Sequence, residues 1–163
     1  MIVVLMGVAG AGKTLIGKAL AERLGWHFYD ADDFHSPENI VRMAAGLPLA
    51  DPDRHDWYDR LIALLARVDT EGKNAILACS ALRSDFRSRL RSSASDVRFV
   101  FLNCDISLCE ERARNRENHY FKAGLVQTQF DALEEPHDAM EIDASQNPEA
   151  IVESILEGLG IRG

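Results

Sequence analysis

The sequence lacks the long apolar runs and the basic excess that mark two large classes of protein. No stretch of its 163 residues is apolar for the roughly 20 positions that a membrane-spanning helix needs. Lys and Arg number 18 against 26 Asp and Glu, and the net charge of −8 argues against a general nucleic-acid binder. An acidic chain can still hold one small anion in a locally positive pocket. We therefore expect no membrane partner and no nucleic-acid partner.

Cysteine is also scarce. Cys79, Cys104 and Cys109 are odd in number and show no C-x-x-C spacing. This usage is typical of unpaired thiols in a reducing cytosol, and no His pair with ligand spacing lies near them, which argues against zinc. The opening residues MIVVLM carry neither a basic region nor a small-residue cleavage site, so they do not resemble a signal peptide. We expect a cytoplasmic protein with free thiols.

The chain does have a regular alternation of short apolar runs and helical patterns. Apolar runs, each of strand length, occupy residues 2–6, 27–29, 75–79, 97–102 and 140–143. Helical patterns occupy residues 14–24, 36–45, 53–71, 84–92, 107–115, 125–133 and 148–159. Such alternation is typical of βαβ units, whose parallel sheet is covered by helices on both faces. The length fits one domain with a substantial core.

A glycine-rich motif follows the first apolar run. GVAGAGKT at 7–14 matches G-x-x-x-x-G-K-[ST] and lies between a predicted strand and a predicted helix, the context that a phosphate-binding loop requires. Glycines let the backbone approach phosphate oxygens, and successive N–H groups form a nest for them. The lysine adds a positive charge, and the threonine hydroxyl suits Mg²⁺. The predicted nucleotide-binding residues are Gly7, Val8, Ala9, Gly10, Ala11, Gly12, Lys13 and Thr14.

Two classes of nucleotide user compete: a phosphotransferase and a GTPase-type switch. The letters DTEG at 69–72 match the switch motif D-x-x-G, but they end an amphipathic helix, and the guanine motif N-K-x-D is absent. Asp30 and Asp32 instead follow the second predicted strand, at the edge where open α/β sheets bind ligands. In an extended backbone both would point to one side, where a carboxylate could accept a hydroxyl proton or hold a water of Mg²⁺. The alternative is an acidic turn.

The polar segment 112–136 carries several cations and lacks a strong core pattern in its first half. Arg112 and Arg116 are spaced i, i+4, so a helix would place both on one face. We predict a mobile lid whose arginines cover the nucleotide, exclude water and stabilise developing charge. The alternative is a solvated surface helix and loop, which charge runs usually form.

Further stretches make the chain resemble the gluconokinases, small P-loop kinases of D-gluconate. They are DADDFH at 30–35, NIVRMAAGLPL at 39–49, DPDRHDW at 51–57, CSALR at 79–83, RENHYFK at 116–122 and TQFDALEEP at 128–136. The resemblance spans about residues 2–155. It implies a nucleoside-monophosphate-kinase-like α/β P-loop fold, in which a five-stranded parallel sheet has helices on both faces and a helical lid. It also implies a single kinase domain over residues 1–163, with the lid at about 112–136.

The resemblance implies ATP-dependent, in-line phosphorylation of D-gluconate to 6-phospho-D-gluconate, with Mg²⁺, in a cytoplasmic homodimer. Implied catalytic residues are Lys13, Asp32 and Arg116. Arg112 and Arg116 join the phosphate loop in binding nucleotide, and Thr14 and Asp32 serve the metal. Implied acceptor-binding residues are Asp32, His35, Arg54 and Arg83.

Each acceptor residue also has a structural interpretation. His35 could bridge the turn before the next helix, and Arg54 could pair with a neighbouring aspartate. Position 83 is Arg where the family often has Lys, which changes the hydrogen-bond geometry. The alternative functions are a kinase of a related hydroxy acid such as shikimate, or a nucleotide-dependent regulator. Shikimate kinases, however, carry a run of three glycines that this chain lacks.

Overall fold

A computed structural model describes residues 1–45, 47, 49–115 and 124–161, and within these the predicted sheet is confirmed. Its five strands are parallel and lie in the order β2-β3-β1-β4-β5. The strands are β1 (Ile2–Met6), β2 (His27–Asp30), β3 (Ala75–Ala78), β4 (Val97–Asn103) and β5 (Met140–Asp143). Arg116 and the rest of the RENHYFK motif at 116–122 lie outside the described residues.

The central strand β1 is buried along its whole length. It pairs with β3 and β4, so that Ile2 lies between Ala75 and Val97. Its side chains alternate between two cores, with Val3 and Leu5 on one face of the sheet and the other three on the opposite face. A strand covered on both faces needs an unbroken apolar run, which explains the sequence pattern.

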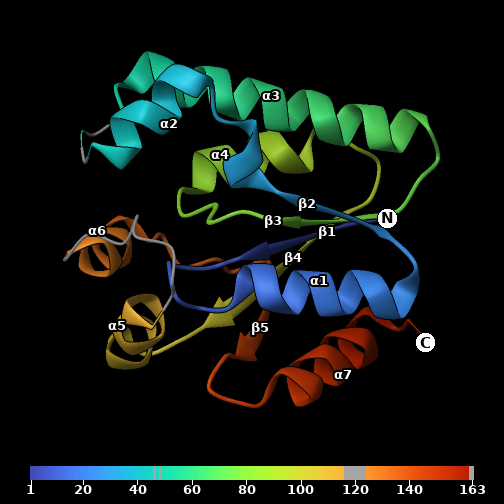
Figure 1. Cartoon of the computed structure of the whole chain (residues 1–163). Helices are drawn as coiled ribbons and strands as arrows, with labels where there is room; N and C mark the ends of the chain where they lie inside the picture. The colour runs from blue at the N-terminus through green and yellow to red at the C-terminus, as the bar shows by residue number, and fades with distance from the viewer. Residues whose placement is uncertain (46, 48, 116–123, 162–163) are drawn as a thin grey trace.

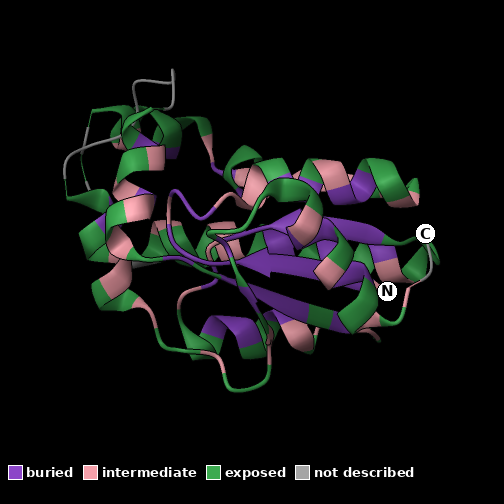
Figure 2. Cartoon of the chain, turned by 90° about the horizontal axis from the view of Figure 1, so that it is seen from below, coloured by how far each residue is buried: buried purple, intermediate pink, exposed green. Residues whose placement is uncertain are grey.

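Helices cover both faces of the sheet (Figure 1). The core of one face is shared by α1 (Lys13–Leu24), α5 (Ile106–Arg114), α6 (Leu125–Ala132) and α7 (Pro148–Leu159). The opposite face packs against α3 (Asp51–Thr70) and α4 (Ser84–Arg91), and α2 (Pro37–Ala44) lies beyond the strand ends. Figure 2 shows the buried sheet between the partly exposed helices. None of the described helices is both long and apolar enough to cross a membrane.

Local signals set the helix ends close to their predicted positions. Helix α1 ends at Gly25, whose φ of 65° is left-handed, and its N–H donates to the Ala21 and Glu22 carbonyls. At the start of α7, Asn147 accepts the Ala150 N–H and Pro148 occupies the first helical turn. The predicted and observed bounds differ by at most two residues at each end.

The extended backbone expected at Asp30 and Asp32 is confirmed at Asp30, the last residue of β2, and is wrong at Asp32. A 3₁₀ helix, η1 (Ala31–Phe34), begins directly after β2 and contains Asp32. The Asp30 carboxylate accepts the Asp32 N–H at 3.1 Å. An aspartate that bonds the backbone two residues ahead favours a turn over a strand, so the two carboxylates do not alternate as strand residues do.

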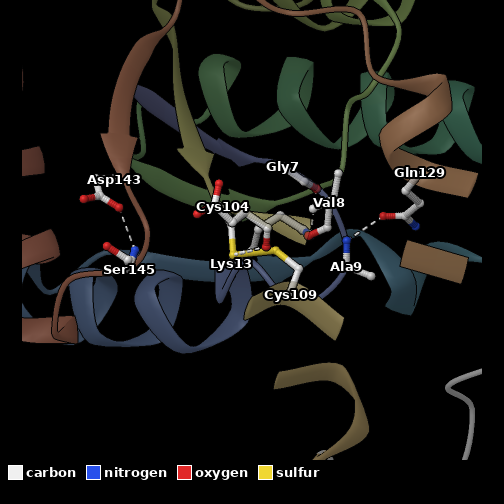
Figure 3. The surroundings of a disulfide bond; sticks show 10 residues. Gly7, Val8, Ala9, Lys13, Cys104, Cys109, Gln129, Asp143 and Ser145 are labelled. Carbon is white, nitrogen blue, oxygen red and sulfur yellow. Dashed lines mark hydrogen bonds between the residues drawn. A yellow bond between two sulfur atoms is a disulfide. The ribbon is translucent and has the colours of Figure 1, made fainter. Parts of the chain in front are cut away.

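The expectation of three unpaired cysteines is also wrong. Cys104 and Cys109 form a disulfide across a Cα–Cα distance of 6.3 Å, beside the phosphate loop (Figure 3). The first turn of α5 brings Cys109 back towards Cys104, a proximity that five-residue spacing does not reveal in the sequence. Cys79 is the free, buried thiol, and burial raises its pKa to about 12.

Candidate active site

The loops that follow β1, β2 and β3 meet at one end of the sheet (Figure 1). The phosphate loop, residues 7–14, leaves β1 and ends in the first turn of α1. Gly10 and Gly12 have φ of 85° and 98°, and Gly12 precedes α1 without a side-chain cap. The amide groups at such a helix start can therefore bind an anion. A Cβ at Gly10 would lie 2.2 Å from the Cys109 carbonyl oxygen, so only glycine fits there.

Lys13 lies across the phosphate loop. Its Nζ donates to the Gly7 and Val8 carbonyl oxygens, both at 2.9 Å. These bonds fix the ammonium group at the mouth of the loop, where a point charge can serve the β- and γ-phosphates of a nucleotide. The structure thus brings Lys13 to the loop as the sequence predicts.

Asp30 is a site residue that the sequence argument did not select. The Thr14 hydroxyl donates to Asp30 Oδ2 at 2.9 Å, whereas Asp32 lies in η1 and is exposed. A hydroxyl and a carboxylate are hard oxygen ligands that fit Mg²⁺, which takes one or two protein ligands together with phosphates. No cluster of three or more His, Cys, Asp or Glu side chains suited to a metal occurs in the described part of the chain. The D-x-D pattern indicates that both carboxylates are candidates. It does not indicate which of them contacts Thr14.

A hollow of about 230 Å³ adjoins the phosphate loop and includes Arg112. Its lining residues come from the loop, α1, α5 and the start of α7: Gly10, Ala11, Gly12, Leu15, Ile16, Arg112, Ala144, Gln146, Pro148 and Ile151. The mixture of apolar surface and one guanidinium suits a nucleotide base and its phosphates. A hollow of about 290 Å³ between α1 and α7 contains none of the predicted site residues.

Arg54 and Arg83 lie near a common hydroxyl, that of Tyr58. Burial and the nearby Cys79 raise the pKa of Tyr58, while the positive charges of Arg54 and Arg83 oppose that rise. The Tyr58 ring stacks on Phe86 at 3.7 Å. Two cations, one from α3 and one from the residue before α4, therefore act electrostatically on one phenol. Sequence reasoning missed Tyr58, although its position one turn after Arg54 could have indicated it.

His35 is buried next to Trp57, whose ring contacts that of Tyr58. It is 9% exposed and stacks on Trp57 at 4.5 Å. The backbone N–H of His35 donates to the Asp32 carbonyl at 3.4 Å. The buried ring atom Nδ1 of His35 has no hydrogen-bond partner among the described residues. Burial and the charge of Arg60 lower the pKa of His35, so the ring is neutral at pH 7.

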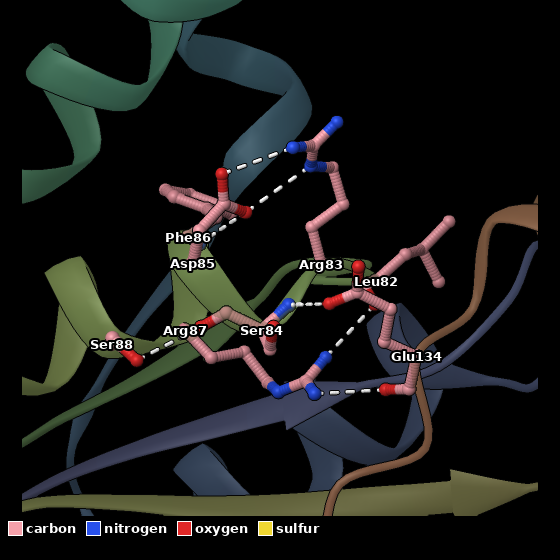
Figure 4. A network of polar contacts seen from close by, with 8 residues as sticks. All are labelled: Leu82, Arg83, Ser84, Asp85, Phe86, Arg87, Ser88 and Glu134. Carbon is pink, nitrogen blue, oxygen red and sulfur yellow. Dashed lines mark hydrogen bonds and ion pairs between the residues drawn. The ribbon is translucent and has the colours of Figure 1, made fainter.

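Arg83 precedes α4 and is held in one orientation by Asp85. Its Nε and Nη2 donate to the two oxygens of Asp85, both at 3.1 Å (Figure 4). This pair raises the pKa of Arg83 and lowers that of Asp85. Because both side chains are exposed, the pair adds little stability. Its two-pronged geometry is the one by which a guanidinium binds a carboxylate ligand.

Comparisons with known proteins show the family to which the chain belongs. The family profile described as an AAA domain matches residues 2–141. A probable gluconokinase of Xenopus tropicalis is 40% identical over 151 residues, which are 83% of this chain and 80% of that protein. The thermoresistant gluconokinase of Escherichia coli strain K12 is 36% identical over 160 residues, or 96% of this chain and 91% of its own.

A solved structure gives the same result. A gluconokinase from Sinorhizobium meliloti 1021 superposes with a TM-score of 0.86 at 38% identity, covering 97% of this chain and 90% of that one. Identity at this level over nearly the full length of both chains, joined to the phosphate loop and the arginine pair, leads to one assignment. The chain belongs to the gluconokinase family.

Proposed function

We propose that this protein transfers the γ-phosphoryl group of ATP to the primary hydroxyl of D-gluconate and forms 6-phospho-D-gluconate. The observation that carries the proposal is an amide-lined anion loop with Lys13 bound across it, at the sheet edge where Arg83 follows β3. The loop suits a triphosphate, and the arginine pair suits a small carboxylate. Membership of the gluconokinase family supports the choice of acceptor.

On the donor side, backbone N–H groups of residues 7–14 and the Lys13 ammonium hold the phosphates. Thr14 and Asp30 would hold Mg²⁺, and Asp32 would serve its bound waters; the ion neutralises charge on the phosphates when bound. The transfer needs little covalent chemistry from the protein, so positioning and charge stabilisation supply most of the rate. Asp32 would accept the proton that leaves the acceptor hydroxyl.

On the acceptor side, Arg54 and Arg83 bind the gluconate carboxylate. The Tyr58 hydroxyl, which feels the charge of both arginines, bonds a sugar hydroxyl. His35 is neutral and buried, and it holds η1, and with it Asp32, against Trp57.

The remaining parts of the proposal concern the single domain, the lid, the assembly and the compartment. We treat residues 1–163 as one kinase domain, and residues 112–136 as a lid that covers the nucleotide with Arg112 and Arg116 and excludes competing water, while its end, from Gln129 on, stays bound to the rest of the domain. We further propose a cytoplasmic homodimer.

A coupled assay of ADP release tests the function. D-gluconate should be turned over far faster than other sugar acids, neutral sugars and shikimate. Lys13→Ala should abolish turnover while the fold persists, and Lys18→Ala, an exposed lysine of the same helix, should leave turnover unchanged. Arg54→Ala should mainly raise the KM for gluconate. Faster turnover of shikimate or of a neutral sugar would contradict the acceptor assignment.

A further inference from the structure

Residues 129–134 contact both substrate loops of the site. This segment comprises the end of α6 and the residues that follow it. On one side it contacts the phosphate loop, and on the other it contacts residues 80–83, which follow β3 and carry Arg83; we call these the acceptor loop. The proposed chemistry uses neither contact.

At the phosphate loop the contact is made by Gln129. Its Oε1 accepts the Ala9 N–H at 2.6 Å, across 120 residues of sequence (Figure 3). Since a backbone N–H is the donor, the contact depends on the carboxamide oxygen. It ties α6 to the loop next to Gly10, the residue that packs on α5.

On the other side the contact is made by Glu134, which forms one hydrogen bond with the acceptor loop and two with α4, the helix that follows this loop. Its N–H donates to the Leu82 carbonyl at 2.9 Å, and its own carbonyl accepts from Arg87 at 2.8 Å (Figure 4). Its side-chain Oε2 accepts the Ser84 N–H, at the start of α4, at 2.5 Å. That bond lowers the pKa of Glu134, so the carboxylate is charged at neutral pH.

The acceptor loop is held in a strained shape from within. Arg87 is only 5% exposed, and its Nη1 donates to the Ala81 and Leu82 carbonyls at 2.9 Å. Ala81 has a φ of 44°, the one left-handed non-glycine residue in the described ranges. Such backbone persists only where its surroundings over-determine it. Arg87 supplies that constraint at Ala81 and Leu82, and Glu134 adds a second bond at Leu82, next to Arg83.

We propose that Gln129 and Glu134 are positioning residues that hold the phosphate loop and the acceptor loop at a fixed separation for phosphoryl transfer. The proposal rests on the proposed function in treating residues 80–83 as the acceptor side. The two loops also meet directly through a long bond of 3.3 Å from the Gly7 N–H to the Ser80 carbonyl. In-line transfer is sensitive to spacing, and a misplacement of about 1 Å costs about 100-fold in rate.

Steady-state kinetics give the first test. Gln129→Ala and Glu134→Ala should each lower kcat about 10- to 100-fold, and Glu134→Gln, which keeps an acceptor oxygen, should restore most of it. Gln127→Ala and Glu135→Ala, exposed residues on either side of the segment, should match the wild type. The double variant should lose little more than the worse single variant, because the two residues act as one unit. Additive losses, each confined to the KM of one substrate, would overturn the proposal.

Amide hydrogen exchange, followed by NMR without any substrate, gives the second test. Glu134→Ala should speed exchange at the distant Ala9 amide as well as at Ser84. Gln129→Ala should likewise speed exchange at the distant Ser84 amide as well as at Ala9. An effect limited to the amide that lost its partner would refute the proposal that Gln129 and Glu134 act together. If the wild type fails to phosphorylate gluconate, the proposed function fails. The exchange result still decides whether Gln129 and Glu134 hold the two loops together.

Discussion

At the scale of single residues, the two carboxylates that follow β2 have different tasks. Asp30 accepts the Thr14 hydroxyl and the Asp32 N–H, so it is fixed from two directions. Asp32 is exposed at the start of η1, on the side where the loops of the site meet. A fixed carboxylate suits a metal partner, and an exposed one suits a proton acceptor.

Substitution should separate these tasks. Asp32→Asn should lower kcat by about 10²- to 10⁴-fold, the usual contribution of a general base, with little change in the KM for ATP. Asp30→Asn should instead raise the Mg²⁺ concentration needed for half-maximal rate, because a neutral amide attracts the cation less. Initial rates over a Mg²⁺ series measure both effects, and Asp33→Asn, the exposed neighbour in η1, provides the control. A rise in Mg²⁺ requirement for Asp32→Asn alone would reverse the assignment.

At the scale of elements, the sequence predicts what depends on local pattern. The apolar run of β1, the glycine motif and the Asn147-Pro148 start of α7 each carry their signal within a few residues, and the structure confirms the predicted elements. The contacts of Gln129 with Ala9 and of Glu134 with Ser84 join residues 120 and 50 positions apart. No periodicity encodes such pairs, because tertiary packing alone brings them together. The turn after Asp30 was the stated alternative to an extended backbone, and the bond from the Asp32 N–H to the Asp30 carboxylate decides for it.

The packing of the phosphate loop on α5 can be tested at Gly10. Gly10→Ala should abolish measurable ATP binding, because the new Cβ would meet the Cys109 carbonyl oxygen at 2.2 Å and the φ of 85° disfavours any side chain. Calorimetric titration with ATP and a thermal melt measure the effect. The control is Gly72→Ala, where φ is 64° but nothing lies within 4 Å of the added Cβ. It should cost about 1–2 kcal/mol of stability and leave ATP binding intact.

At the scale of the whole molecule, stability depends on groups that join the site to the core. His35 is such a group, because it stacks on Trp57 of α3 while its backbone completes η1. Trp57 in turn donates from Nε1 to the Ala31 carbonyl at 2.7 Å. The same two elements carry Asp32 and Arg54, so charging this buried ring should affect the fold and the acceptor pocket together.

The free energy of unfolding should therefore fall as the pH drops below about 6.5, the ordinary pKa of histidine. Burial lowers the pKa of His35 in the folded chain, so between the two pKa values the unfolded state binds the extra proton and gains stability. The slope cannot exceed about 1.4 kcal/mol per pH unit for one proton, and below the folded pKa it vanishes. Urea unfolding from pH 5 to 8 should show this slope in the wild type and in His137→Gln, an exposed control, but not in His35→Gln. An equal slope in all three would mean that His35 does not control this transition.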